Sequence, residues 1–462
     1  MSKFTTLEEI VQARMSNHAT LVGIGIKVCE MELLRPIAEQ VHIAQKTVKY
    51  TPTEKLTDAF IAILAGAQGL VEINKQVRPD PALQAAFGRN GCAEQSVVQD
   101  TLDACNAANV EQMYRAMQEI YQRHGRAYRH DFLLNWLILD ADLTGRPCGE
   151  KAAFACKGYF EGQPNRRGRQ VGYVVATQYE EVVIERVFSG KTGLTEAIVP
   201  MMTAAAQTLG LDADKRARTI IREDAGGGSV KATNDLLMQG YQVHGKDYSM
   251  MRVKGLADQV DTWISDPHDP GRQVGWVSTP TDLYCRPVRR IAVRCRKKNG
   301  QWGLGVILST LSPADVLWLT GESSARLADP AAVLLAYVYF YDQRGGGVEI
   351  EIKEDKQGLG SRKRNKKRFP AQEIVAQLEA LAHNLIVWAR AWFTPQWHKV
   401  AHWGILRLVR DVFHINGIIR FDHRTRIKQI ILNQRDPLAQ HVSECLAAIL
   451  AKEQVNVILG EI

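Results

Sequence analysis

The stretch NWLILDADLTG, residues 135–145, decides how the middle of this chain folds. An apolar run leads into two acidic residues, Asp140 and Asp142, which is the pattern of a buried strand with a polar end. The stretch ARTIIREDAGGGS, residues 217–229, repeats this pattern and reaches Asp224. Because helical patterns alternate with these strands, the sequence predicts an α/β architecture.

Outward from this core, the pattern of the sequence changes repeatedly and predicts five parts. Residues 1–130 are mostly helical, and the spacing of Thr51 and Glu54 is that of a capping box. Two short helices between about Pro81 and Cys105 have helix-turn-helix spacing, although an ordinary helical hairpin explains them equally well. The predicted parts are a helical domain (1–130), the first part of the core (131–240), a β-rich insertion (241–312), the second part of the core (313–400) and a C-terminal region (401–462).

Two hairpins and one long helix are predicted in the second half of the chain. Asn299-Gly300 is a strong turn signal between two apolar runs of the insertion. A late hairpin is predicted around Asn416-Gly417 by the same dipeptide. Between them, an amphipathic helix is predicted from about Ala371.

The composition is that of a globular protein with a locally concentrated positive charge. The 462 residues are 45% hydrophobic and 23% charged, with a net charge of +8. Residues 271–300 carry +7 and residues 357–370 carry +6, so the remainder carries −5. This distribution suits a polyanionic partner, although charge runs are also common in solvated loops. The candidate contacts are Arg289, Arg290, Arg362, Lys363, Arg364, Lys366, Lys367 and Arg368.

Neither a membrane span nor a cysteine-based metal site is indicated by the sequence. The longest strongly apolar stretch, around residues 331–341, is well short of the ~18 residues that a bilayer requires. The eight cysteines are scattered without a CxxC pair, so a zinc knuckle is not indicated. We expect a cytoplasmic protein.

Acidic residues stand at positions where ligands gather in α/β proteins. Asp140 or Asp142 closes one strand, and Asp224 closes another just before three glycines. A third acid, Glu349, precedes Lys353 and Lys356 at helical spacing. Hard oxygen ligands suit Mg²⁺ or Mn²⁺, and two such ions about 4 Å apart can act on a phosphodiester. Strand-end acids are, however, also common as caps and in solvated turns.

These segments resemble the DDE transposases of bacterial insertion sequences, in particular those with a ribonuclease H-like core interrupted by a β insertion. LDADLTG (139–145) resembles the first-aspartate motif and REDAGGGS (222–229) the second. YDQRGGGVEIEIKEDKQGL (341–359) resembles the glutamate motif with its Tyr-Arg-Glu-Lys signature. The likeness covers nearly the whole chain.

The resemblance implies that Asp142, Asp224 and Glu349 are the catalytic residues and hold the metal ions. Asp142 is preferred because Leu143-Thr144 follow it in the Asp-x-Thr/Ser form, and Asp140 is the alternative first aspartate. Glu349 is preferred because six residues separate it from Lys356, as in the family.

The same signature implies that Tyr341, Arg344 and Lys356 contact DNA phosphates. One departure from the family pattern concerns the first two of these residues. Four residues separate Arg344 from Glu349, where the usual signature has three. A tryptophan of the insertion (Trp263, Trp276 or Trp302) could stack on a flipped base, although a core role is the more common one for tryptophan.

The implied activity is metal-dependent cleavage at the ends of an insertion sequence, followed by strand transfer into target DNA. The partners would be double-stranded DNA, namely the terminal inverted repeats and the target, and a second copy of the chain in a homodimer. The N-terminal domain would recognise the ends, the C-terminal region would support dimerisation, and the cytoplasmic protein would be nucleoid-associated. Two alternatives stay open: a ribonuclease H-like nuclease without strand transfer, and a non-catalytic DNA-binding repressor derived from a transposase.

Overall fold

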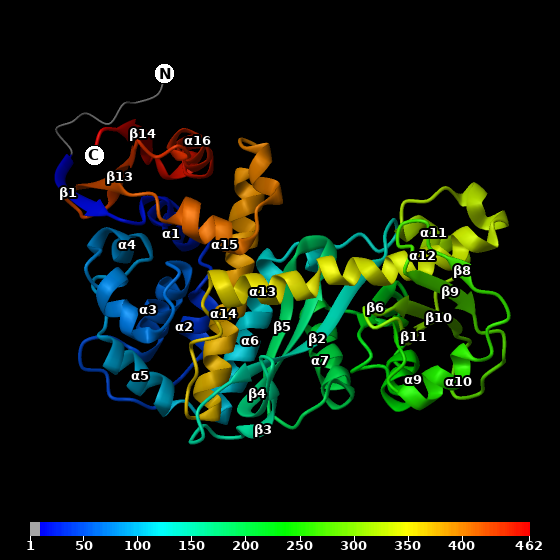
Figure 1. The fold of residues 1–462 in the computed structure, drawn as a ribbon. Coiled ribbons are helices and arrows are strands. Elements are labelled where there is room, and N and C mark those ends of the chain that lie inside the picture. Colours follow the sequence, from blue (N-terminus) through cyan, green and yellow to red (C-terminus); the bar gives the residue numbers. More distant parts are fainter. Residues whose placement is uncertain (1–9) are drawn as a thin grey trace. The chain divides into compact units, whose positions relative to one another are not determined.

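The structure, a computed structural model, describes residues 10–462, and the chain divides into two compact units (Figure 1). The terminal unit contains the described residues up to His124 together with Cys148–Ala153 and Ile352–Ile462. The central unit contains Gly125–Pro147 and Phe154–Glu351. Each unit combines segments that are far apart in the sequence, and the five predicted parts stay a prediction.

The central unit is built on a ten-stranded sheet. Its order is β3-β4-β2-β6-β7-β11-β10-β9-β8, and β5 also pairs with β4. β2 is antiparallel to β4 and parallel to β6, which is parallel to β7. The strands are β2 (Leu137–Pro147), β3 (Cys156–Phe160), β4 (Gln163–Ala176), β5 (Glu181–Phe188), β6 (Thr219–Glu223), β7 (Gln242–Lys246), β8 (Ile264–Ser265), β9 (Arg272–Trp276), β10 (Arg289–Arg296) and β11 (Trp302–Ser309).

The β-rich insertion continues this sheet instead of forming a separate one. β11 pairs with β7 in antiparallel register, with Leu308 opposite Gly245. The hairpin predicted at Asn299-Gly300 is confirmed, since β10 and β11 pair along their whole length. Gly300 has a φ of +79°, a conformation that glycine adopts without strain.

Helices pack against the sheet of the central unit and confirm the predicted mixed α/β architecture. α7 ends at Gly210, whose φ of +62° allows the left-handed conformation of a helix C-terminus. α12 packs on β9, β10 and β11, and nearly all its side chains are buried, which explains the long apolar run. The helices are α7 (Leu194–Leu209), α8 (Ala213–Ala217), α9 (Val230–Met238), α10 (Met250–Ala257), α11 (Pro313–Leu319) and α12 (Pro330–Asp342).

The terminal unit contains a four-stranded sheet that joins both ends of the described chain. Its order is β1 (Ile10–Ser16), β12 (Gly417–Asp422), β13 (Ile427–Asn433) and β14 (Asn456–Gly460). β12 and β13 form the predicted late hairpin, but its turn follows Asp422, so the predicted turn at Asn416-Gly417 is wrong. Gly417 instead lies inside the pairing, where a Cβ atom would stand 2.5 Å from the Ile431 carbonyl oxygen. Close packing, and not a turn, explains this glycine.

Helices fill the rest of the terminal unit. Thr51 and Glu54 form the predicted capping box at the start of α3. The long helix predicted from Ala371 is α14, which begins at Phe369 and is buried along most of its length. The helices are α1 (Ala19–Glu30), α2 (Arg35–Gln40), α3 (Pro52–Leu64), α4 (Pro81–Ala86), α5 (Gln95–Ala104), α6 (Ala107–His124), α14 (Phe369–Phe393), α15 (Ile405–Arg407) and α16 (Ala439–Ile449).

One helix, α13 (Val348–Gly358), begins in the central unit and ends in the terminal unit. It confirms the helical spacing predicted for Glu349, Lys353 and Lys356. No helix in residues 10–462 combines the length and the apolar character that crossing a membrane requires.

Candidate acidic site and basic segments

Two of the three predicted catalytic acids meet at one arginine of the central unit. Arg344 lies in a short 3₁₀ turn after α12 and is 3% exposed. Its Nη2 atom is 3.2 Å from a carboxylate oxygen of Asp142, and its Nη1 atom donates to Glu349 at 3.2 Å. The side chain of Asp142 is 18% exposed and that of Glu349 is 58% exposed. The guanidinium therefore bridges a strand acid and a helix acid.

Asp224 follows β6, the parallel neighbour of β2, and begins the glycine-rich loop. Its carboxylate accepts a hydrogen bond from the backbone N–H of Gly226 at 2.8 Å. A Cβ atom on Gly228 would lie 1.7 Å from the carbonyl oxygen of Lys246, so only glycine lets this loop pack against the end of β7. The loop thus holds Asp224 at the end of the sheet where Asp142 lies.

The electrostatics of Asp142 reflect the charged groups around it. The pKa of Asp142 is raised to about 6, chiefly by burial, while Arg344 lowers it and the negative charges of Asp224 and Glu349 contribute to the rise. A carboxylate with other negative charges nearby attracts cations, because an added positive charge relieves the repulsion. The acids predicted as a group therefore form a coupled electrostatic cluster, and their catalytic role remains a prediction.

Asp140, the alternative first aspartate, forms an ion pair with a different arginine. Its two carboxylate oxygens accept hydrogen bonds from Arg222 at 2.6 and 2.8 Å, and both side chains are buried. The hydroxyl of Thr177 donates to the same carboxylate at 2.7 Å. Because these bonds use both oxygens of Asp140, the geometry favours Asp142 as the acid available to a ligand.

The side chains at this site are of the types that bind a divalent metal ion, but they do not lie close enough together to hold one. Asp142, Asp224 and Glu349 supply the oxygen donors that Mg²⁺ and Mn²⁺ prefer. Yet within residues 10–462, no group of three His, Cys, Asp or Glu side chains is gathered closely enough to hold a metal ion. The guanidinium of Arg344 contacts both Asp142 and Glu349.

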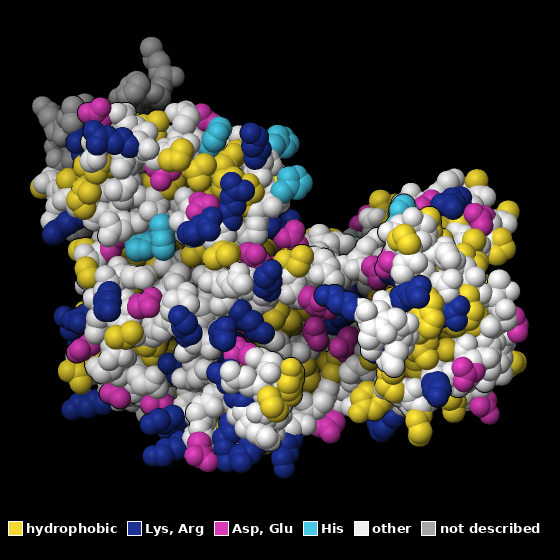
Figure 2. Space-filling model, in the orientation of Figure 1, with side chains coloured by type: hydrophobic (Ala, Val, Ile, Leu, Met, Phe, Trp, Pro, Cys, Tyr) yellow, Lys and Arg dark blue, Asp and Glu magenta, His cyan; other side chains and the backbone are white. Residues whose placement is uncertain are grey.

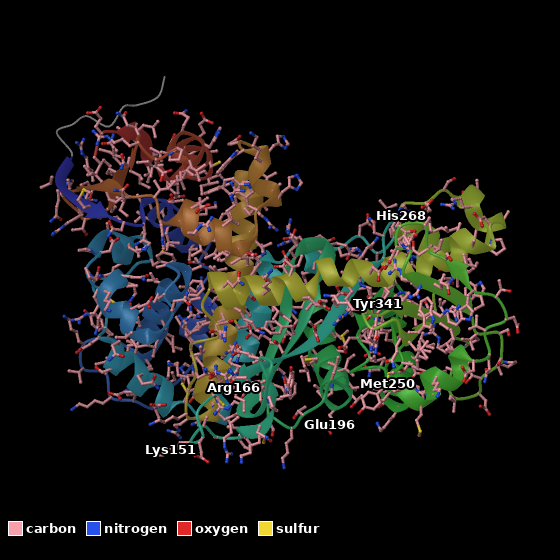
Figure 3. All side chains as sticks on the ribbon, in the orientation of Figure 1. Lys151, Arg166, Glu196, Met250, His268 and Tyr341 are labelled. Atoms are coloured by element: carbon pink, nitrogen blue, oxygen red, sulfur yellow. The ribbon has the colours of Figure 1, made fainter. Side chains whose placement is uncertain are left out.

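Lys246 is a cationic residue at this site that sequence reasoning missed. It ends β7, and its Nζ atom lies 4.4 Å from the ring centroid of Tyr341, the residue labelled at the end of α12 in Figure 3. Burial lowers the pKa of Lys246, and the charges of Asp342 and Asp224 counteract this effect. Lys246 also lines a largely apolar cavity of about 290 Å³, together with Ala225 and Met250. A lone lysine at a strand end carries no sequence signal for such a position.

Glu223 was also missed, because it lies within the strand pattern directly before Asp224. Its side chain is fully buried, and within the described chain its Oε2 atom has no hydrogen-bond partner. Burial raises the pKa of Glu223 to about 8, and the neighbouring charge of Asp224 adds to the shift. Burial therefore favours the neutral form of Glu223.

The basic run at 362–368 belongs to the terminal unit and is only partly a surface feature. Arg364 is buried in an ion pair with Glu379 at 3.0 Å, and Lys366 is buried beside Gln99 at 3.0 Å. These two residues therefore do not lie on the surface of the terminal unit, and their contact with DNA stays a prediction. Their partners lie far away in the sequence, so the local sequence pattern does not indicate that they are buried. The exposed residues of the run are Arg362, Lys363, Lys367 and Arg368.

The remaining residues predicted to contact DNA are also partly exposed and partly buried. Arg289 is exposed, but Arg290 is buried and donates to the carbonyl oxygen of Thr279, and their contact with DNA stays a prediction. Tyr341 is also buried, under Lys246. Lys353 is exposed and Lys356 half-buried in the second half of α13, within the terminal unit. On the face shown in Figure 2, Lys and Arg side chains are interspersed with Asp and Glu.

The tryptophans of the insertion differ in their surroundings. Trp276 packs edge-to-face on Tyr337 in the core of the central unit. Trp302 is 40% exposed, and the guanidinium of Arg294 lies 4.8 Å from its ring centroid and 4.1 Å from that of Trp263. The core interpretation therefore holds for Trp276, while Trp263 and Trp302 flank an arginine.

Comparisons with known proteins show a weak structural similarity to a transposase. No protein-family model matches the chain, and no curated protein is similar to it in sequence. The fold is similar to that of a piggyBac transposase in a synaptic complex with hairpin DNA, solved by cryo-EM. The match has 10% sequence identity and a TM-score of 0.47, and it covers 87% of this chain and 82% of that chain. A similarity at this level carries no conclusion about chemistry or partners.

Proposed function

We propose that the protein is a DNA transposase that cleaves phosphodiester bonds at the ends of its own element and joins the freed ends to target DNA. The observation that carries the proposal is geometric: Arg344 contacts both Asp142 and Glu349, and Asp224 follows Glu223, which pairs with Ala141 beside Asp142. These acids come from three segments that are distant in the sequence and that resemble the three acid motifs of DDE transposases. An accidental set of caps would not be expected to converge in this way.

The sheet around these acids supports the proposal. β5, β4 and β2 are antiparallel neighbours, and β6 and β7 continue the sheet in parallel to β2. We propose this five-stranded part as the ribonuclease H-like core, into which the segment from β8 to β11 is inserted. Asp224 directly follows β6, and Asp142 lies within β2 at the point where its parallel pairing with β6 ends, so the strand predicted to close at this acid continues to Pro147. Ligands commonly bind at the ends of parallel strands in α/β sheets.

Different residues of the chain would have different roles in cleavage. Bound Mg²⁺ or Mn²⁺, two ions in the proposed complex, would activate the attacking oxygen and stabilise the leaving oxygen. Asp142, Asp224 and Glu349 would hold these ions, and a ligating carboxylate must be ionised. Lys246, beside Tyr341, would place a positive charge next to phosphate oxygens.

Cleavage of end-labelled DNA tests the proposal. Purified protein is incubated with the DNA that flanks its reading frame and Mg²⁺ or Mn²⁺. We expect cuts at an inverted repeat for the wild type, and a loss of at least about 100-fold for Asp142→Asn and Glu349→Ala, since each removes a metal ligand. Asp214→Asn changes one exposed acid of α8 and serves as the matched control that retains cleavage.

The same assay separates the alternatives. Cuts that are never followed by joining to a target duplex would point to a nuclease without strand transfer. Binding to the repeats without any cut, in both the wild type and Asp142→Asn, would contradict the transposase and favour a repressor.

A further inference from the structure

Arg344 occupies the position that a cation would take between two of the acids. Its guanidinium contacts Asp142 and Glu349, each at 3.2 Å, and also donates to the carbonyl oxygen of Ala141 at 3.2 Å. We call this set of contacts the Arg344 bridge. The bridge neutralises part of the acidic cluster from within the chain, without any external ion.

The turn that carries Arg344 is shaped to bring it there. Three glycines, Gly345, Gly346 and Gly347, separate Arg344 from Val348 and α13. A Cβ atom on Gly347 would lie 2.7 Å from the Asp140 carboxylate and 3.0 Å from Thr177. Only glycine therefore lets this turn pack on the buried ion pair of Asp140. This turn places the side chain of Arg344 next to Glu349.

A divalent ion and the Arg344 bridge need the same oxygens. The guanidinium stands between Asp142 and Glu349, and like charges repel strongly in a site of low polarity. A metal ion held by these acids would therefore require the guanidinium to leave at least one of them. This requirement matches the finding that no three metal-binding side chains are gathered in the described residues.

A DNA phosphate is a suitable new partner for the guanidinium. Arginine and phosphate form paired, charge-assisted hydrogen bonds in a fixed geometry. In the bridge, the Nε atom of Arg344 is buried and has no hydrogen-bond partner among residues 10–462. A phosphate oxygen could accept a hydrogen bond from this atom, so the exchange of partners leaves fewer unsatisfied groups.

We propose that Arg344 prevents metal ions from binding to the acidic site while its guanidinium contacts Asp142 and Glu349. A DNA phosphate that binds the guanidinium would release these acids for a metal ion. The inference rests on the proposed function, because DNA is the partner that opens the site. DNA binding and metal binding then strengthen each other, since each ligand favours the same displaced position of Arg344. Reciprocal coupling of this kind is a requirement of thermodynamics. Arg344 is thus a positioning residue for the metal ligands.

Mn²⁺ binding to the full chain, followed by electron paramagnetic resonance, tests the inference without relying on activity. We expect Arg344→Gln to bind Mn²⁺ about tenfold more tightly than the wild type in the absence of DNA. Arg344→Lys retains a positive charge and is expected to stay closer to the wild type. Asp142→Asn should lose the site and so measures Mn²⁺ bound elsewhere, and Asp214→Asn is the matched control.

A second measurement uses only the wild type and does not depend on how Arg344→Gln folds. Mn²⁺ affinity is measured with and without a DNA duplex, and the binding that remains in Asp142→Asn with DNA is subtracted. We expect DNA to tighten Mn²⁺ binding to the wild type about tenfold. In Arg344→Gln, the same duplex should change the affinity little.

Two results would overturn the inference: an unchanged or weaker Mn²⁺ affinity in a folded Arg344→Gln variant, or no effect of DNA on the wild type. If the wild type still cuts DNA at specific ends in either case, the proposed function survives and only the role of Arg344 fails. If Mn²⁺ binding shifts as expected but nothing is cut, the role of Arg344 survives and the transposase fails.

Discussion

Asp140 and Asp142 lie two residues apart on β2, yet their carboxylates have different surroundings. Arg222 and Thr177 satisfy both oxygens of Asp140. Asp142 shares one arginine with Glu349 and remains near two other acids. Asp140 therefore has the contacts of a structural ion pair, whereas burial disfavours the charged form of Asp142.

The stability of the protein should therefore depend on pH through Asp142. Its pKa is raised to about 6 in the folded chain, above the value of about 3.9 for an unfolded aspartate. A raised pKa means that the group's contribution to stability is fully present below about pH 4 and is lost as pH rises through about 6. We expect Asp142→Asn to be more stable than the wild type at pH 8, by about 2–3 kcal/mol. Thermal melting between pH 4 and pH 8 measures this difference.

Asp214→Asn, which removes an exposed charge, provides the baseline for that comparison. The difference between Asp142→Asn and the wild type should shrink toward zero as pH falls to 4. A constant difference over the whole range would show that Asp142 is not strained by burial.

Elements with local signals were predicted well from the sequence, and contacts between distant elements were not. The β10–β11 hairpin follows from Asn299-Gly300, and the start of α3 follows from Thr51 and Glu54, because turns and caps are set by neighbouring residues. The pairing of β11 with β7 depends on residues far apart, so the insertion's place in the main sheet was not foreseen.

The candidate site shows the same division. The acid-bearing motifs predicted Asp142, Asp224 and Glu349 as a group, and the charges of the other two acids contribute to the raised pKa of Asp142. Burial of Arg364 depends on Glu379, and the position of Lys246 depends on Tyr341 from another element. No local pattern encodes such partners, so the burial of Arg364 was not predicted and Lys246 was overlooked.

The ion pair of Asp140 and Arg222 connects β2, β6 and α12, because Arg222 also donates to the carbonyl oxygen of Phe340 at 2.9 Å. We expect Asp140→Asn to destabilise the protein by about 3–5 kcal/mol, since it leaves a buried guanidinium without its counter-charge. Urea unfolding monitored by circular dichroism measures the loss.

The double variant Asp140→Leu with Arg222→Met is the control for that measurement. Replacing both charges with apolar side chains should restore most of the lost stability, because no buried charge then remains. An Asp140→Asn protein within about 1 kcal/mol of the wild type would argue against an intact ion pair.

At the scale of the whole molecule, the two basic runs of the sequence overstate the number of positive side chains that they present to DNA. Arg290, Arg364 and Lys366 are buried. The electrostatic attraction for a polyanion must therefore come from exposed residues such as Arg362, Lys363 and Lys367.

Neutralising Arg362, Lys363 and Lys367 together by Gln should weaken DNA binding for all sequences. We expect the slope of log affinity against log salt to fall by up to about 2.7, since each phosphate contact contributes about 0.9. Fluorescence anisotropy over a range of salt concentrations measures the slope. Arg364→Gln is the contrasting variant, and it should lower the melting temperature because it breaks a buried ion pair. An unchanged slope in the triple variant would place this segment away from DNA.

The pairing of β1 with β12 has a consequence for how the protein is made. Ser16 lies opposite Gly417, so the first described strand has no partner until the ribosome has synthesised some 400 further residues. The central unit is nearly continuous in the sequence and can complete its sheet during that interval. The acid-bearing sheet should thus be assembled before β1 is paired, which makes the exposed edge of β1 the segment that most needs protection from aggregation during synthesis.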